Sequence, residues 1–219
     1  MAVLTDHLPV RQKMTDLRAK FTKTKIDKMF RLGYKLAFGT KSKKKKWDDI
    51  FSLWYCAATN GHSRAQFYLA TCYDNAHGTR KDLQLAFEWY LKAAKVGHRD
   101  SQFNVGHFFG NDELEIKNHR KKVYWYTKAA NAGLIDAQRD LGYSYFYGEG
   151  VKKDKKRAVF WYKKAAVKKD DKAFYNLALC YKYGDGVKKS KRWAKYYFLK
   201  ADKLGYKLAK GQLRNLDKE

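Results

Sequence analysis

The stretch Ala158–Val187, AVFWYKKAAVKKDDKAFYNLALCYKYGDGV, decides the fold because its pattern recurs along the chain. It reads as an amphipathic helix, a tight turn, a second amphipathic helix and a glycine loop. One 36-residue period earlier the chain has VYWYTKAANAGLIDAQRDLGYSYFYGEGV, and one period before that AFEWYLKAAKVGHRDSQFNVGHFFGN. Self-similarity at a fixed period of roughly 20 to 50 residues is typical of repeat proteins. We therefore predict an all-α solenoid of helix–turn–helix repeats.

The first helix of each repeat, helix A, carries two adjacent aromatic columns and a pair of alanines one turn later. The aromatic and the alanine lie on one helical face, so the alanines let a neighbouring helix approach while the rings fill the space between repeats. A glycine is expected to take the left-handed conformation in the turn to the second helix, helix B, but the fourth repeat has Lys169 there, which predicts a differently shaped turn. The first aromatic column is Leu53, Trp89, Trp125, Trp161 and Tyr197, the second is Trp54, Tyr90, Tyr126 and Tyr162, and the turn glycines are Gly61, Gly97, Gly133 and Gly205.

The start of the chain departs most from this pattern, as expected of a capping repeat whose outer face meets water. Residues 1–46 are predicted to form a degenerate pair of helices, over 8–24 and Ile26–Phe38. Residues 47–219 are predicted to form one continuous solenoid domain of tandem repeats, with roughly 12 helices in all given the 36-residue period.

The chain is strongly basic, with 48 lysines and arginines against 22 acidic residues and a formal charge of +26. This balance indicates an acidic partner: an acidic protein, nucleic acid or an anionic membrane. No apolar run is long enough for a secretion signal or a membrane span, and three cysteines favour a reducing compartment. We expect a cytoplasmic protein in which Cys72 and Cys180 are buried and Cys56 is exposed and more reactive.

The repeats share the consensus A-x-x-W-Y-x-K-A-A-x-x-G-x-x-x-A-x-x-x-L-G-x-x-Y-x-x-G-x-G-V. This consensus resembles that of the Sel-one-like repeat (SLR) family, relatives of the tetratricopeptide repeats. The resemblance covers about residues 25 to 219. It implies a right-handed α-solenoid that acts as an adaptor, holding other proteins in a concave groove lined by the A helices, and in some bacteria neutralising secreted effectors. It is clearest at Trp161, Tyr162, Ala165, Ala166, Ala173, Leu177, Tyr181, Gly184, Gly186 and Val187.

One position before the first aromatic column, helix A carries further aromatics that core packing does not require, with a lysine one turn later. Aromatic rings give contact area at little entropic cost, and lysines attract acidic groups over long range. The alternative is that the rings pack between adjacent A helices and the lysines are merely solvated. The candidate partner-binding residues are Glu88, Lys92, Tyr124, Lys128, Phe160, Lys164, Tyr196 and Lys200.

A second basic surface comes from the loops, which recur at the repeat period and should form a basic edge. Such an edge could follow a phosphate backbone with strongly salt-dependent affinity. Nucleic acid is the second choice, because arginine is scarce and no nucleic-acid-binding motif is present. The residues are Lys43, Lys44, Lys45, Lys152, Lys153, Lys155, Lys156, Arg157, Lys188, Lys189 and Arg192.

Nothing in the sequence marks a catalytic trio, a cofactor site or a metal site. His62 and His98 follow equivalent turn glycines but lie one repeat apart, too far to share an ion. A membrane partner is not expected, because no lipidation motif or amphipathic anchor is present. We predict a non-enzymatic adaptor for an acidic protein, and the resemblance adds a bacterial regulator or an effector-neutralising (immunity-type) protein as its narrower role.

Overall fold

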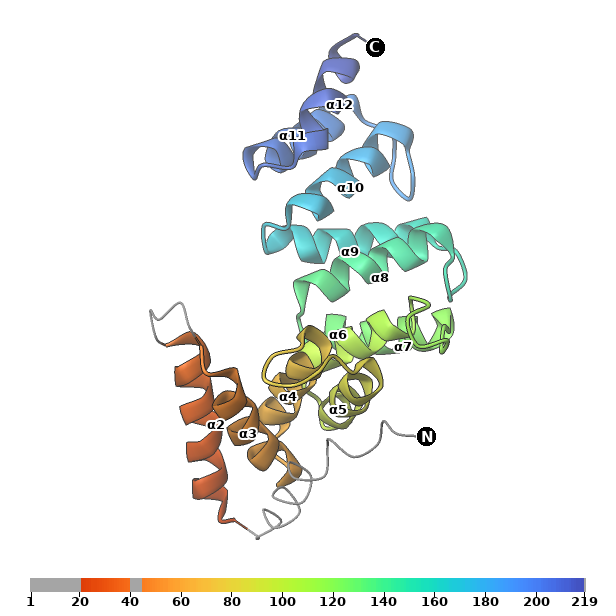
Figure 1. The fold of residues 1–219 in the computed structure, drawn as a ribbon. Helices are drawn as coiled ribbons and strands as arrows, with labels where there is room; N and C mark the ends of the chain where they lie inside the picture. The colour runs from red at the N-terminus through yellow and green to blue at the C-terminus, as the bar shows by residue number, and fades with distance from the viewer. Residues whose placement is uncertain (1–20, 40–44, 219) are drawn as a thin grey trace, which may run out of the picture. The chain divides into compact units, whose positions relative to one another are not determined.

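The computed structural model describes residues 21–39 and 45–218, and every regular element within them is an α-helix (Figure 1). Along these residues no helix is long and apolar enough to cross a membrane. The all-helical repeat fold is confirmed, and most of the helix predicted over 8–24 lies outside the described residues. The eleven helices in the described part of the chain are α2 (Lys23–Phe38), α3 (Trp47–Thr59), α4 (Ser63–Asn75), α5 (Leu83–Lys95), α6 (Arg99–Phe108), α7 (His119–Asn131), α8 (Ile135–Tyr147), α9 (Lys155–Val167), α10 (Asp171–Tyr183), α11 (Lys191–Lys203) and α12 (Lys207–Lys218).

The chain divides into two compact units, and the boundary falls between Ser101 and Gln102 within α6. Unit 1 contains α2 to α5 and the first residues of α6. Unit 2 contains the rest of α6 and α7 to α12. The continuity of a single solenoid domain over 47–219 stays a prediction.

The core of each unit forms where a B helix packs against the A helix that follows it. The second aromatic column covers a small residue of the preceding B helix. A Cβ added to Gly106 or Gly142 would lie 2.5 or 2.6 Å from the ring of Tyr126 or Tyr162, respectively. In unit 1, a Cβ on Gly33 would lie 2.7 Å from the indole nitrogen of Trp54. The equivalent pairs are Ala70 with Tyr90 and Ala178 with Phe198, all four of them buried.

The first aromatic column contributes less to this core than expected. Trp161 is buried, whereas Trp89 and Trp125 are only half-buried. The paired alanines, by contrast, are buried in every A helix of the regular repeats, as Ala129 and Ala130 are in α7. Close helix packing therefore depends mainly on the second column and the alanines.

The turn at Lys169 corrects the prediction of a different shape. Its φ of 62° places it in the same left-handed region as Gly133, at 84°, and Gly205, at 91°. Its amide donates to the Ala166 carbonyl at 2.9 Å, as that of Gly133 does to Ala130 at 3.0 Å. The same turn therefore forms with a lysine as with a glycine, and the lysine adopts a conformation that is unfavourable for a residue with a Cβ.

Replacing Lys169 with glycine is expected to raise the free energy of unfolding by about 0.5–1 kcal/mol, because glycine removes the Cβ strain at some cost in backbone entropy. Urea denaturation followed by circular dichroism measures the change. Lys168→Gly is the matched control, since Lys168 is also exposed but has a φ of −90°. Equal effects of the two substitutions would contradict the argument.

The return loop after helix B closes each regular repeat onto its own helix A. A Cβ on Gly78, Gly150 or Gly186 would lie only 2.1 to 2.3 Å from the backbone oxygen of the first residue of that helix A: Trp47, His119 and Lys155, respectively. All three glycines have positive φ. Two loop carboxylates reinforce the closure: Glu149 lies 2.8 Å from His119 Nδ1, and Asp185 pairs with Lys155. In repeat two the equivalent residue is Leu114, so this glycine contact is replaced there.

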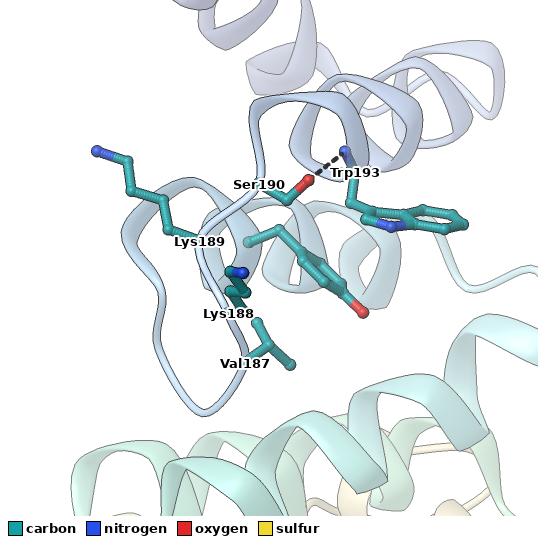
Figure 2. A pocket seen from close by; sticks show the side chains of 6 residues that line it. Val187, Lys188, Lys189, Ser190 and Trp193 are labelled. Atoms are coloured by element: carbon teal, nitrogen blue, oxygen red, sulfur yellow. Dashed lines mark hydrogen bonds between the residues drawn. The ribbon is translucent and has the colours of Figure 1, made fainter.

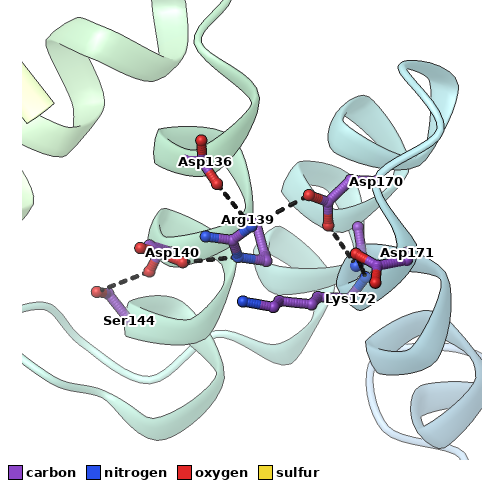
Figure 3. Close-up of polar contacts among 8 residues, drawn as sticks. Asp136, Arg139, Asp140, Ser144, Asp170, Asp171 and Lys172 are labelled. Atoms are coloured by element: carbon purple, nitrogen blue, oxygen red, sulfur yellow. Dashed lines mark hydrogen bonds and ion pairs between the residues drawn. The ribbon is translucent and has the colours of Figure 1, made fainter. Parts of the chain in front are cut away.

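A largely buried arginine joins two consecutive B helices in unit 2 (Figure 3). Arg139 of α8 contacts Asp136 at 2.8 Å, Asp140 at 2.9 Å and Asp170 at 3.1 Å. Asp170 also caps α10, because its other carboxylate oxygen accepts from the amide of Ala173 at 2.6 Å. Burial raises the pKa of the Asp140 carboxyl, and Arg139 opposes that rise. One guanidinium therefore contacts three carboxylates across the joint between repeats.

The two histidines considered as metal ligands cap helices instead. His62 Nδ1 accepts from the Ala65 amide at 3.0 Å, and His98 Nδ1 accepts from the Ser101 amide at 3.3 Å. Burial lowers the pKa of both imidazoles, which favours the neutral form that capping requires. Within residues 21–39 and 45–218 no group of three histidine, cysteine or acidic side chains could hold a metal ion.

The prediction for Cys56 is wrong, because its side chain is buried with only 4% of the residue exposed. Burial raises the pKa of its thiol. Cys72 and Cys180 are buried as predicted, and burial raises the pKa of each to about 12. All three thiols are therefore protonated and unreactive at neutral pH.

Candidate binding surface

The extra aromatics of helix A are exposed in unit 2. Tyr124 of α7, Phe160 of α9 and Tyr196 of α11 are 54%, 51% and 44% exposed. Of the two positions that follow each ring, the second is buried in every case, at Tyr126, Tyr162 and Phe198, whereas the first is buried only at Trp161. The three rings are therefore not buried between adjacent A helices, and partner binding through them stays a prediction.

Each of these rings is held in the same way. The lysine one turn later places its ammonium 5.1 Å from the Tyr124 ring, 4.9 Å from Phe160 and 5.4 Å from Tyr196. The next aromatic of the same helix meets each ring edge-on, with centroids 5.1 to 5.2 Å apart. The repeated geometry orients the rings before any partner arrives, which lowers the entropic cost of binding. We call this set the aromatic–lysine face: Tyr124, Lys128, Phe160, Lys164, Tyr196 and Lys200.

The aromatic–lysine face is electrostatically one-sided. Neither α7 nor α9 contains an acidic residue, and α11 contains only Asp202. The exposed ammonium groups of Lys128 and Lys164 therefore have no carboxylate on their own helices, and Lys200 has only Asp202 on its helix. A partner that brings carboxylates to this face gains attraction on approach, and the rings add apolar contact.

The two candidate residues of unit 1 differ from the other six. Glu88 occupies the aromatic position and accepts a hydrogen bond from Gln84 at 3.3 Å. Lys92 places its ammonium 3.8 Å from the centroid of Trp89. Repeat two thus keeps the lysine but not the exposed ring, and its contribution to a common surface stays a prediction.

The basic edge is partly neutralised within the fold. Lys155 is paired with Asp185. Arg157 lies 3.4 Å from Asp154 and stacks over Tyr145 at 5.6 Å. Lys45 donates to a backbone carbonyl of α2, and Lys43 and Lys44 lie outside the described residues. The edge residues exposed to solvent are Lys152, Lys153, Lys156, Arg157, Lys188, Lys189 and Arg192, and nucleic-acid binding through them stays a prediction.

An aromatic pocket that the sequence did not predict lies at the start of α11 (Figure 2). Trp193 is 46% exposed, and its ring centroid lies 6.2 Å from that of Tyr181. The two preceding repeats carry a cation at the position of Trp193, Lys121 and Arg157, so the departure can be seen in the sequence. The pocket is lined by Tyr181, Val187, Lys188, Lys189, Ser190 and Trp193.

A family model for the Sel1 repeat matches four consecutive segments of the chain, residues 63–98, 99–134, 135–168 and 172–206. Each segment begins at or near a B helix and ends near the next A–B turn. A search of curated proteins finds no match.

Solved structures show the same fold. A protective antigen of uropathogenic Escherichia coli with an SLR fold is 34% identical, with a TM-score of 0.79 over 88% of this chain and 41% of its own. The chain thus spans about two fifths of that protein. A Sel1 repeat protein from Oxalobacter formigenes is 29% identical, with a TM-score of 0.79 over 95% of this chain and 84% of its own. An immunity protein from Pseudomonas aeruginosa is 25% identical, with a TM-score of 0.53 over 84% and 67% of the two chains.

Proposed function

Because this chain belongs to the Sel1 repeat family, we propose that it is a non-enzymatic adaptor that binds an acidic protein through the aromatic–lysine face of unit 2. The observation that carries the proposal is the threefold repetition of a half-exposed ring with an ammonium group above it. Burying such rings at the centre of an interface contributes strongly to affinity, and the lysines select a partner of negative charge.

The narrower role is that of an immunity-type protein, in which the bound partner is an effector that this chain neutralises. The likeness to the immunity protein of Pseudomonas aeruginosa supports this role. A basic chain of net charge +26 suits an acidic effector, because the long-range field accelerates encounter and opposes dissociation at low salt.

The test compares two double variants that remove equal numbers of exposed rings. Tyr124→Ser with Phe160→Ser alters the aromatic–lysine face. Tyr147→Ser with Tyr183→Ser is the matched control, because these tyrosines end helices α8 and α10 and are 59% and 60% exposed. The partner is first captured by the wild-type chain and identified by mass spectrometry, and the purified partner is then titrated by calorimetry.

We expect the first variant to bind the purified partner at least tenfold more weakly, since each lost anchor costs about 1 kcal/mol or more. The control variant should bind within about twofold of the wild type, and circular dichroism should show equal helicity for all three. Unchanged affinity of the first variant, or an equal loss in the control, would refute the proposed face.

A further inference from the structure

The pocket at the start of α11 differs from the equivalent places in the two preceding repeats. There, a cation from the first turn of helix A covers an aromatic ring that lies in the preceding helix B or directly after it. Lys121 lies 5.2 Å above Phe109, and Arg157 lies 5.6 Å above Tyr145. In the repeat that begins with α11, Trp193 takes the position that the cation has in the two preceding repeats. Its ring is tilted by 34° to that of Tyr181.

This exchange leaves an open aromatic recess instead of a ring covered by a charge. The recess has a volume of about 480 Å³, and Val187 adds an aliphatic surface to it. Figure 2 shows Trp193 and Val187 on different sides of the recess. Ser190 fixes the position of the tryptophan, because its hydroxyl oxygen accepts from the Trp193 amide at 3.3 Å at the start of α11.

The charges around the recess favour an anionic ligand over a cationic one. Lys188 and Lys189 line it, and the exposed side chains of Lys191 and Arg192 follow directly in the sequence. The acidic residue of the same loop, Asp185, is already paired with Lys155. A cation approaching the rings would meet several like charges, whereas a carboxylate would find a partner.

The recess is continuous with the aromatic–lysine face. Trp193 and Tyr196 meet edge-on, with centroids 5.5 Å apart and planes at 86°. Lys200 lies above Tyr196 at 5.4 Å. Positions 193, 196 and 200 fall on one side of a helix. A segment bound along α11 can therefore contact the recess and the last ring of that face together.

We propose that the recess receives one aromatic side chain from an acidic segment of the partner protein, with the flanking carboxylates paired to Lys188 and Lys189. The partner's acidity rests on the proposed function, but the recess supplies a separate anchor. An apolar side chain enclosed by Trp193, Tyr181 and Val187 gives affinity, and the lysines give selectivity for acidic flanks.

The test uses the full chain and short fluorescent peptides as probes. The main probe has a phenylalanine between two pairs of glutamates. Its controls replace the phenylalanine with alanine or the glutamates with lysines. Fluorescence anisotropy at near-physiological salt should show that the main probe binds at least tenfold more tightly than either control.

The variant Trp193→Arg restores the residue that the preceding repeat carries at this position, so it should fold normally and fill the recess as Arg157 covers Tyr145. We expect it to weaken binding of the main probe at least tenfold while the melting temperature stays unchanged. Equal binding of the phenylalanine and alanine probes, unchanged binding by Trp193→Arg, or no binding of any probe would overturn the proposal.

These outcomes are separable from those for the proposed function. The variant with Tyr124→Ser and Phe160→Ser leaves the recess intact, so it should bind the main probe as the wild type does. If the probe fails but that variant still loses the whole partner, only the recess proposal falls. If the probe binds as expected but that variant keeps the partner, only the proposed face falls.

Discussion

Replacing Gly186 with alanine is expected to lower the free energy of unfolding by about 3 kcal/mol, from the combined cost of left-handed backbone strain and overpacking. Gly186 has a φ of 72°, and its Cβ would lie 2.2 Å from the backbone oxygen of Lys155. That oxygen belongs to the first residue of α9, so it cannot move aside as a flexible side chain would. The loop must withdraw, which also weakens the pairing of Asp185 with Lys155.

Gly133→Ala is the matched control for this prediction. Gly133 has a φ of 84°, but a Cβ there would meet nothing within 4 Å. Gly133→Ala should therefore lower the free energy of unfolding by about 1 kcal/mol, from backbone strain alone. Urea denaturation of both variants measures the difference. Losses of equal size would show that the contact with α9 contributes nothing.

Replacing Arg139 with methionine is expected to lower the free energy of unfolding by about 3 kcal/mol, because it removes the central positive charge of a largely buried charge network. The side chain of Arg139 is 14% exposed and that of Asp170 only 9%. Methionine keeps most of the apolar stem, so the loss reports the charge and its hydrogen bonds more than packing. Thermal and urea denaturation measure it.

The pH dependence of this loss provides a further check. Burial already raises the pKa of Asp140, and removing Arg139 raises it further. A carboxyl whose pKa is higher in the folded than in the unfolded state stabilises the fold as it takes up a proton. The reduction in the free energy of unfolding caused by Arg139→Met should therefore become smaller as the pH falls toward 4. Asp136→Asn is the control: its side chain is 54% exposed, and it should cost less than about 1 kcal/mol. A loss that grows at low pH would contradict this account.

The sequence predicted the repeat fold because the period is strict and every repeat carries the same helix and turn signals. It left open whether Tyr124 and Phe160 are exposed or pack between adjacent A helices, and the structure exposes both rings. What it missed depends on packing between elements. The hydrogen-bonded A–B turn places Lys169 in the left-handed conformation, and helix packing buries Cys56 at a position that is lysine in later repeats.

The pocket at Trp193 was missed for a related reason. A tryptophan in helix A reads as core, and only comparison with Lys121 and Arg157 at the same repeat position shows that it replaces a surface cation. The pocket also depends on Tyr181, which belongs to the preceding helix and lies beside Trp193. Periodicity identifies what repeats share, whereas a binding site arises where one repeat departs from the others.

The fit between each small B-helix residue and the next helix A has a consequence for chimeric solenoids. Gly142 and Tyr162 match each other in size across their joint, as Ala178 and Phe198 do across the next. A recombinant array spliced between a B helix and the following A helix would separate such partners. It could place an alanine against a ring that packs against a glycine in its own repeat. Splicing at the A–B turn keeps both partners on the same donor fragment, so the transferable module is a B helix with the A helix after it.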